Sequence, residues 1–256
     1  MVTSPPQPQL GSNFTNGFED NQTCENKLIS VTPCSAIDGA SINDDPDTAD
    51  GIEYDWADAD SFMNGGTTRA LVEIGGQCWF GRNTTTESTH TGTNDFDGFY
   101  NNSSTEPGVG EGRLYQWEAA MNGVSGTAAE RAQGVCPTGW HVPSDCEWMY
   151  LENSLGMSTM DQENLNNRNS GSVGSKLSTL TDNGTNSSGF TALLAGWRSF
   201  MPPNNSNDRG SQGFLWSSSE VSANEAHRRF LQSSQEGVNR VSASKAVGFS
   251  VRCLKD

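Results

Sequence analysis

The sequence predicts an α+β fold with a mainly antiparallel sheet and many loops. Two segments have the spacing of short helices, and about seven short segments have the pattern of strands, without regular alternation between the two kinds. This order favours antiparallel strands, because parallel strands need a crossover, usually a helix, between them. Gly contributes 28 of the 256 residues, so we expect long loops between the strands.

The first two strands are predicted as a hairpin. Residues 70–74 alternate between apolar and polar side chains, and residues 77–80 form a second strand-like run. Gly75 and Gly76 lie between them, and a glycine pair at such a place is typical of a tight β-turn.

A first helix is predicted over residues 113–121, where Leu114, Trp117 and Met121 fall at helical spacing. A second helix starts after Ser144. With Glu147 this serine forms a capping box, in which each side chain accepts a hydrogen bond from a backbone N–H at the helix start. In this second helix Trp148, Leu151 and Leu155 fall on one face, and Gly156 can end it.

Five further strands are predicted in the C-terminal third of the chain. They cover residues 190–197, 214–219, 227–231, 240–244 and 248–253. Polar turns separate the last of these segments, as expected for an antiparallel arrangement.

Charge is distributed unevenly along a chain whose net charge is −16. Residues 1–66 contain twelve acidic residues and one lysine, whereas residues 190–256 contain eight basic and five acidic residues. An acidic protein repels nucleic-acid phosphates, so we expect no nucleic-acid partner. No apolar run has the length of a membrane-spanning helix, so we expect no membrane insertion.

Six cysteines in a loop-rich chain suggest disulfides and an oxidising environment. Six cysteines allow fifteen pairings, and free buried thiols are the alternative. The chain has no Cys-x-x-Cys pair, and its three histidines lack the spacing of zinc ligands, so a structural zinc site is not expected.

Five motifs follow one another along the chain. They are Ile-Gly-Gly-Gln-Cys-Trp at 74–79, Arg-Leu-Tyr-Gln-Trp at 113–117, Cys-Pro-Thr-Gly-Trp-His-Val-Pro-Ser-Asp-Cys-Glu-Trp at 136–148, Leu-Trp-Ser-Ser-Ser-Glu at 215–220 and Gly-Phe-Ser-Val-Arg-Cys at 248–253. In this order they resemble the Fibrobacter-type major paralogous domain, over about residues 35–256. We expect residues 1–34 to be a flexible lead-in.

The resemblance implies a C-type-lectin-like fold of the formylglycine-generating-enzyme type, with C-terminal strands and loops that present a binding face. In some members, the variable proteins of diversity-generating retroelements, targeted mutagenesis rewrites that face. Residues 221–247 occupy the matching position here. The chain departs from the pattern by an acidic insertion at 40–66 and by Cys146, where a small residue is expected.

Within such a fold, Cys136 and Cys253 flank strands that are expected to be neighbours, so this disulfide is favoured. The remaining pairings are then Cys24 with Cys34 and Cys78 with Cys146. Five tryptophans are expected to be buried: Trp79, Trp117, Trp140, Trp148 and Trp216.

We predict ligand-binding residues in the region 197–247. Alternation in a strand directs neighbouring side chains to opposite faces, so one face can be core while the other meets a ligand. Trp216, Phe230 and Phe249 are interpreted as core anchors. The predicted ligand-binding residues are Trp197, Ser199, Phe200, Val221, Ser222, Asn224, His227, Arg229, Gln232, Ser234, Asn239, Arg240, Ser242, Ser244 and Lys245. Ordinary solvent-facing strand residues are the alternative interpretation.

The expected function is binding of a protein or glycan partner outside the cell, on a cell surface or a virus particle. No enzymatic activity is expected, because no histidine stands in a catalytic motif and His141 is interpreted as structural. Only Cys253 follows Cys146, so the C-terminal cysteine pair of formylglycine-generating enzymes has no counterpart.

The alternative function is that of a calcium-stabilised structural protein, on a cell surface or anchoring a polysaccharide. Acidic side chains are abundant at 44–60, and residues 94–98 resemble half of a calcium loop. Neither segment fits the twelve-residue calcium loop, and no other cofactor is expected.

Overall fold

The computed structural model describes residues 9–10, 24, 27–34, 71–92, 96–108, 110–179 and 184–256. The expected lead-in 1–34 is therefore described in part, and the acidic insertion 40–66 lies outside the described residues.

The described part of the chain contains strands and short helices joined by loops. The strands are β1 (Gln9–Leu10), β2 (Leu28–Ile29), β3 (Leu71–Ile74), β4 (Gln77–Phe80), β5 (Asp97–Gly98), β6 (Leu114–Tyr115), β7 (Trp140–His141), β8 (Asn166–Arg168), β9 (Trp197–Arg198), β10 (Ser206–Asn207), β11 (Gln212–Ser222), β12 (Glu225–Gln232), β13 (Val238–Ser244) and β14 (Leu254–Lys255). The helices are α2 (Trp117–Ala120), α3 (Asp145–Ser154), α4 (Thr159–Gln162) and α5 (Val173–Leu177), with 3-10 turns η3 (Tyr100–Asn102), η4 (Gly126–Ala129) and η5 (Ser170–Ser172).

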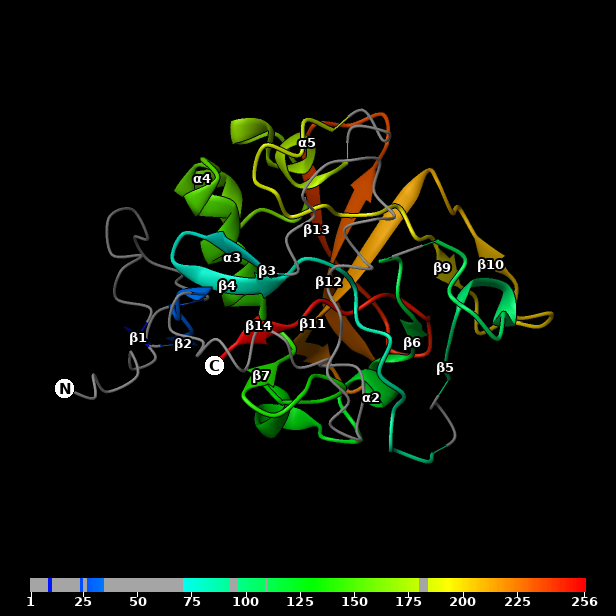
Figure 1. Cartoon of the computed structure of the whole chain (residues 1–256). Coiled ribbons are helices and arrows are strands. Elements are labelled where there is room, and N and C mark those ends of the chain that lie inside the picture. Colours follow the sequence, from blue (N-terminus) through cyan, green and yellow to red (C-terminus); the bar gives the residue numbers. More distant parts are fainter. Residues whose placement is uncertain are drawn as a thin grey trace.

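Two four-stranded sheets organise the fold. One has the strand order β11-β12-β13-β8 and the other β3-β4-β14-β7, and all neighbours in both are antiparallel. We call the sheet β11-β12-β13-β8 the longer sheet, because its strands β11, β12 and β13 are the longest. Figure 1 shows α3 and the β3–β4 hairpin on one side of the longer sheet, and β9, β10 and β5 on the other. The α+β class and the mainly antiparallel pairing are thus confirmed.

The predicted hairpin and the predicted capped helix are both present. Val72 of β3 pairs with Trp79 of β4 across a turn in which Gly75 and Gly76 have φ of +60° and +79°. At the start of α3, the Glu147 N–H donates to Ser144 Oγ at 3.2 Å, and the Ser144 N–H donates to Glu147 Oε2 at 2.9 Å.

Other elements differ from the predictions. The helix predicted over 113–121 is reduced to α2, because the Tyr115 N–H donates to Phe249 O at 2.7 Å and holds β6 extended. The strand predicted over 190–197 is absent up to Gly196, since Thr191 and Gly196 have φ of +56° and +74°. Helices α4 and α5 were not predicted, because four or five residues are too few to show a helical period.

Apolar side chains form two main clusters, one on each side of the longer sheet. The cluster towards α3 contains Trp79, Trp148 and Leu231, and the opposite one contains Trp117 and Trp216. The four tryptophans among these are fully buried, as predicted. Trp140 is only partly buried, because it lies at the margin of its cluster with its ring 4.4 Å from that of Phe80.

Three disulfides join the described cysteines. The predicted pair Cys136–Cys253 is confirmed. The other two pairings were wrong: Cys24 is bonded to Cys146 and Cys34 to Cys78. The physical reason is that β2 packs against the N-terminal half of α3, which brings Cys24 to the helix, while Thr32 O accepts from the Cys78 N–H at 2.9 Å and brings the next cysteine to β4.

These contacts place residues 27–34 within the packed domain, so it extends N-terminally beyond the expected boundary at residue 35. Among the described residues, no helix is long and apolar enough to cross a membrane.

Glu147 joins the start of α3 to the C-terminal end of the chain. Its carboxylate contacts Arg131 Nε at 2.9 Å and His141 Nε2 at 3.0 Å, and His141 Nδ1 in turn contacts Asp256 at 2.6 Å. Burial by itself raises the pKa of Glu147, but His141 and Arg131 have the larger, opposite effect and lower this pKa to about 2. His141 is thus a hydrogen-bonded structural residue, as predicted.

Peptide mapping of the unreduced protein tests the three disulfides. Cleavage after Lys and Arg separates Cys24, Cys34 and Cys78, and cleavage before Asp145 separates Cys136 from Cys146. We expect mass spectrometry to detect linked peptides for Cys24–Cys146, Cys34–Cys78 and Cys136–Cys253. A peptide linking Cys24 to Cys34 would contradict this arrangement.

Glu147→Gln should lower the free energy of unfolding at pH 6 by about 3 kcal/mol, since the pKa of Glu147 is reduced from 4.5 to about 2 and a difference of one pKa unit corresponds to about 1.4 kcal/mol. Because the folded-state pKa is the lower one, this stability is present above about pH 4.5 and is lost as the pH falls towards about 2.

Urea titrations at several pH values measure this effect. The wild-type free energy of unfolding should decrease more steeply between pH 4.5 and 2 than that of E147Q. Glu87→Gln, which changes an exposed carboxylate, is the control and should lower the free energy of unfolding at pH 6 by less than about 1 kcal/mol. Equal slopes for wild type and E147Q would show that Glu147 is not the group responsible.

Candidate functional site

The two faces of β12 have different surroundings. Leu231 lies in the apolar cluster that contains Trp148 of α3, whereas Phe230 packs against the cluster on the opposite side. We call the side towards α3 the inner face and the other the outer face. Because side chains alternate along a strand, Arg229 shares the inner face with Leu231, and Arg228 shares the outer face with Phe230.

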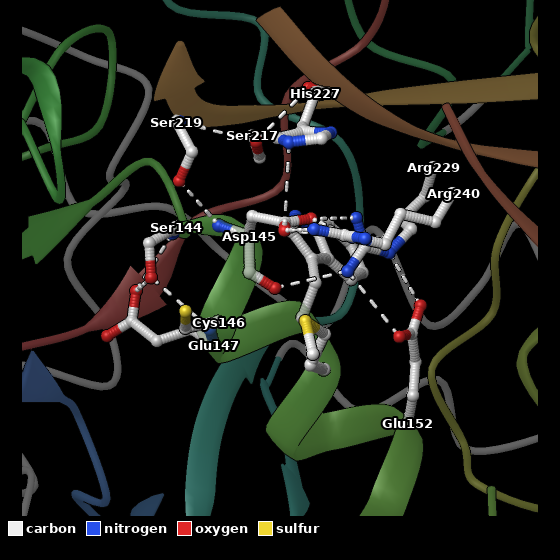
Figure 2. Close-up of polar contacts among 12 residues, drawn as sticks. Ser144, Asp145, Cys146, Glu147, Glu152, Ser217, Ser219, His227, Arg229 and Arg240 are labelled. Atoms are coloured by element: carbon white, nitrogen blue, oxygen red, sulfur yellow. Dashed lines mark hydrogen bonds and ion pairs between the residues drawn. The ribbon is translucent and has the colours of Figure 1, made fainter. Parts of the chain in front are cut away.

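The inner face carries a buried ion cluster, which we define as Asp145, Glu152, Arg168, Arg229 and Arg240. Arg229 donates from Nη1 to Asp145 Oδ1 at 2.5 Å and from Nε to Glu152 Oε1 at 2.6 Å. Arg240 donates from Nη2 to Asp145 Oδ2 at 2.6 Å, and Arg168 donates to both Glu152 oxygens at 2.7 and 2.9 Å. Figure 2 shows Arg229 and Arg240 reaching from the strands towards these carboxylates on α3.

The ion cluster controls the charge of its members. Burial raises the pKa of Asp145, but Arg229 and Arg240 lower it well below its usual range. His227 lies beside the cluster, with Nε2 4.0 Å from Asp145, and burial lowers its pKa despite that carboxylate. At neutral pH Asp145 is therefore ionised, and the neighbouring His227 is neutral.

Three of the predicted ligand-binding residues are consequently interior. Arg229 and Arg240 are buried in the ion cluster. Lys245 is buried as well, with Nζ 2.7 Å from Glu220 Oε1 and 4.3 Å from the centre of the Trp117 ring. Their side chains bind other parts of the same domain and are not presented at the surface.

The turn between β11 and β12 presents predicted residues to solvent. Val221, Ser222 and Asn224 are exposed there. Beside the turn lies a groove of about 420 Å³, lined by Lys27, Gly126, Thr127, Glu130, Glu220, Val221, Ser222 and Ala223. Burial raises the pKa of Glu130, although Ser219 Oγ donates to its carboxylate at 2.8 Å and partly offsets this effect. The groove thus combines apolar, hydroxyl and carboxyl groups.

The outer face contains a row of three stacked phenylalanines. The Phe214 ring lies 4.7 Å from that of Phe230 and 4.9 Å from that of Phe249. Near the turn, β6 and α2 cover this face, so that Trp216 and Ala226 are fully buried. Further along the strands the face is partly open.

We call this open area the outer-face patch and define it as Arg228, Phe230, Gln232 and Asn239. The first three alternate along β12, and Asn239 of β13 pairs with Phe230. All four side chains are partly exposed. Gln232 and Asn239 were predicted as ligand-binding residues, whereas Arg228 was missed.

The sequence did contain a signal for Arg228. Two consecutive arginines in a strand must point to opposite faces, so Arg228 and Arg229 cannot both belong to one environment. Arg229 enters the ion cluster, and Arg228 is left among the aromatic rings of the outer face.

The remaining predicted residues do not join these areas into one site. Ser242 and Ser244 are partly exposed on β13, near the exposed turn, and Ser234 is exposed beyond the far end of β12. Trp197, Ser199 and Phe200 lie at the β9–β10 hairpin, where Phe200 is 41% exposed and Trp197 Nε1 donates to Asp208 at 2.7 Å.

The alternative function as a calcium-stabilised structural protein depends on the acidic segment 40–66, which lies outside the described residues. Within the described part of the chain, no group of three or more His, Cys, Asp or Glu side chains could hold a metal ion. Asp97, from the predicted half loop, accepts from the Ser88 N–H at 2.6 Å.

Arg229→Met should lower the free energy of unfolding by about 3–5 kcal/mol, because it leaves buried carboxylates without their partner. The control is Arg209→Met, which removes a partly exposed ion pair with Glu111 and should cost less than about 1 kcal/mol. Denaturant titration measures both. The role of the ion cluster is refuted if R229M is no less stable than R209M.

Comparison with known proteins gives one match. The family model of the Fibrobacter succinogenes major domain matches residues 72–255, which extend from β3 to β14 and include both four-stranded sheets. No curated protein and no solved structure matches the chain. Because the match covers more than half of the sequence, the chain belongs to the Fibrobacter succinogenes major domain family.

Proposed function

We propose that this domain is a non-enzymatic ligand-binding protein that contacts a protein or glycan partner through its C-terminal sheet. The contact surface comprises the β11–β12 turn, with its groove, and the outer-face patch. The observation that carries this proposal is the exposure of Val221, Ser222 and Asn224 at the end of a hairpin whose strands are held on both faces.

A rigid support favours binding, because little conformational entropy is lost when the ligand docks. On the inner face, the ion cluster attaches β12 and β13 to α3. On the outer face, Trp117 Nε1 donates to Ser217 O at 2.9 Å and Trp216 Nε1 donates to Tyr115 O at 2.8 Å. Side chains at the turn therefore project from a fixed backbone.

The proposal has two further parts: the domain has a C-type-lectin-like fold, and its C-terminal region is diversified by a retroelement. Strand β14, at the C-terminal end, pairs with β4 and β7 and so joins the last strand of the family match to the β3–β4 hairpin at its start. Within 221–247, substitutions at the exposed turn would alter the contact surface without touching the core. Arg229 and Arg240 would have to stay unchanged, because the ion cluster needs them.

The three disulfides are typical of secreted or extracellular proteins. We propose that the domain acts on a cell surface or a virus particle, without binding nucleic acid and without inserting into a membrane.

A combined glycan and protein array, probed with the intact disulfide-bonded chain, tests the proposal. We expect a ligand whose affinity decreases at least tenfold in the triple variant Val221→Lys, Ser222→Glu, Asn224→Lys. The free energy of unfolding of this triple variant should differ from that of the wild type by no more than about 0.5 kcal/mol per substitution, because the three side chains are exposed.

The matched control is Met160→Lys with Leu165→Glu, at positions that are 82% and 56% exposed on and after α4, away from the proposed surface. This variant should bind like the wild type. The proposal fails if no ligand is found, or if every ligand found binds both the triple variant and Arg228→Met, a substitution in the outer-face patch, as tightly as the wild type.

A further inference from the structure

Arg228 differs from the fully buried arginines of the chain. Arg168 and Arg229 donate to carboxylates, and Arg252 donates to Asn83 and to the carbonyl groups of Phe80 and Phe190. The Nε and Nη1 atoms of Arg228 are shielded from solvent and have no hydrogen-bond partner in the described structure. Its guanidinium group is therefore largely removed from water without a counter-ion among these residues.

Aromatic rings are the neighbours that Arg228 does have. Its guanidinium carbon lies 4.7 Å from the ring centre of Phe214, 5.1 Å from that of Phe249 and 5.5 Å from that of Phe230. Cation–π contacts of this kind attract the guanidinium group, but the rings offer its N–H groups neither an oxygen acceptor nor an opposite charge. The rings therefore orient the guanidinium group without supplying a counter-ion.

Arg228 is partly exposed, and Nε and Nη1 are its shielded nitrogens, so Nη2 is the nitrogen that a ligand can approach. Burial lowers the pKa of Arg228 to about 10, so the side chain remains charged at neutral pH. A ligand carboxylate placed there would supply the missing counter-ion. Charge-assisted hydrogen bonds from arginine to a carboxylate are about twice as strong as neutral ones.

The other members of the outer-face patch indicate what surrounds that carboxylate. Phe230 presents a partly exposed ring, on which the C–H face of a sugar can pack. Gln232 follows on the same face of β12, and Asn239 lies across from Phe230 on β13. Neither amide side chain hydrogen-bonds within the described residues, so both are available to hydroxyl groups.

We propose that the outer-face patch binds a uronic acid unit of an acidic glycan. Arg228 binds the carboxylate, Phe230 supports the sugar ring, and Gln232 and Asn239 bind hydroxyl groups. This inference rests on the proposed ligand-binding function and assigns its ligand class. The net charge of −16 repels anions at long range, so recognition of a uronate carboxylate depends on this local cation.

Isothermal titration calorimetry with a panel of uronate oligosaccharides and their methyl esters tests the proposal. At least one oligouronate should bind the wild type, and its methyl ester should bind at least tenfold more weakly, because esterification removes the negative charge. Arg228→Met should also weaken oligouronate binding at least tenfold, and Arg228→Lys should weaken it less.

The matched control is Arg113→Met. Arg113 also lies over a phenylalanine ring, at 4.6 Å from Phe99, but it already contacts a carboxylate of its own chain, Glu87. R113M should therefore bind oligouronates like the wild type.

Thermal unfolding gives a second readout. The oligouronate should raise the melting temperature of the wild type and of R113M, and should leave that of R228M unchanged. Without ligand, R228M should melt at or above the wild-type temperature, since the substitution removes an unpaired cation.

The inference is overturned if R228M and wild type bind the oligouronates equally, if the methyl esters bind as tightly as the acids, or if nothing in the panel binds. An acidic peptide that binds in place of the oligouronates, with the same dependence on Arg228, would overturn the glycan assignment. A ligand found on the array that depends on the β11–β12 turn but not on Arg228 would overturn this inference alone and leave the proposed function intact.

Discussion

The structure depends on the ion cluster that joins α3 to the inner face of the longer sheet. Asp145 receives Arg229 and Arg240 from two strands, and Glu152 receives Arg229 together with Arg168. Separating buried ions costs free energy, because each charge would be left without a partner in the protein interior, where the dielectric constant is low. The cluster therefore sets the position of β12 and β13 relative to the helix, and with it the face that each strand residue occupies.

This constraint explains why two adjacent arginines have different surroundings. The cluster draws Arg229 inward, and the alternation of the strand then places Arg228 on the opposite face, over the phenylalanine row. One guanidinium group is fully paired and holds the fold together. The other has aromatic neighbours and two nitrogens without a hydrogen-bond partner among the described residues. The stabilising interaction on one face thus creates the candidate binding position on the other.

Local patterns were sufficient for some predictions. The Gly75-Gly76 turn and the Ser144–Glu147 capping box were found because each depends on residues close in sequence. The α+β class and the Cys136–Cys253 pair were also predicted correctly. The strand expected over 190–197 was wrong, because apolar composition does not reveal the positive φ of Thr191. Of the residues predicted to bind a ligand, Val221, Ser222 and Asn224 are exposed and Gln232 and Asn239 are partly exposed, whereas Arg229 and Arg240 are buried.

By itself, the sequence determined the Gly75-Gly76 turn, the capped start of α3 and the motifs that assign the chain to its family, since each depends on residues that are near one another or follow in order. Tertiary structure decided which polar side chains are interior. An arginine in a strand has the same local pattern whether it meets solvent or a buried carboxylate, and Asp145 lies 84 residues before Arg229 in the chain. The same holds for Cys24 and Cys146, whose pairing depends on the packing of β2 against α3.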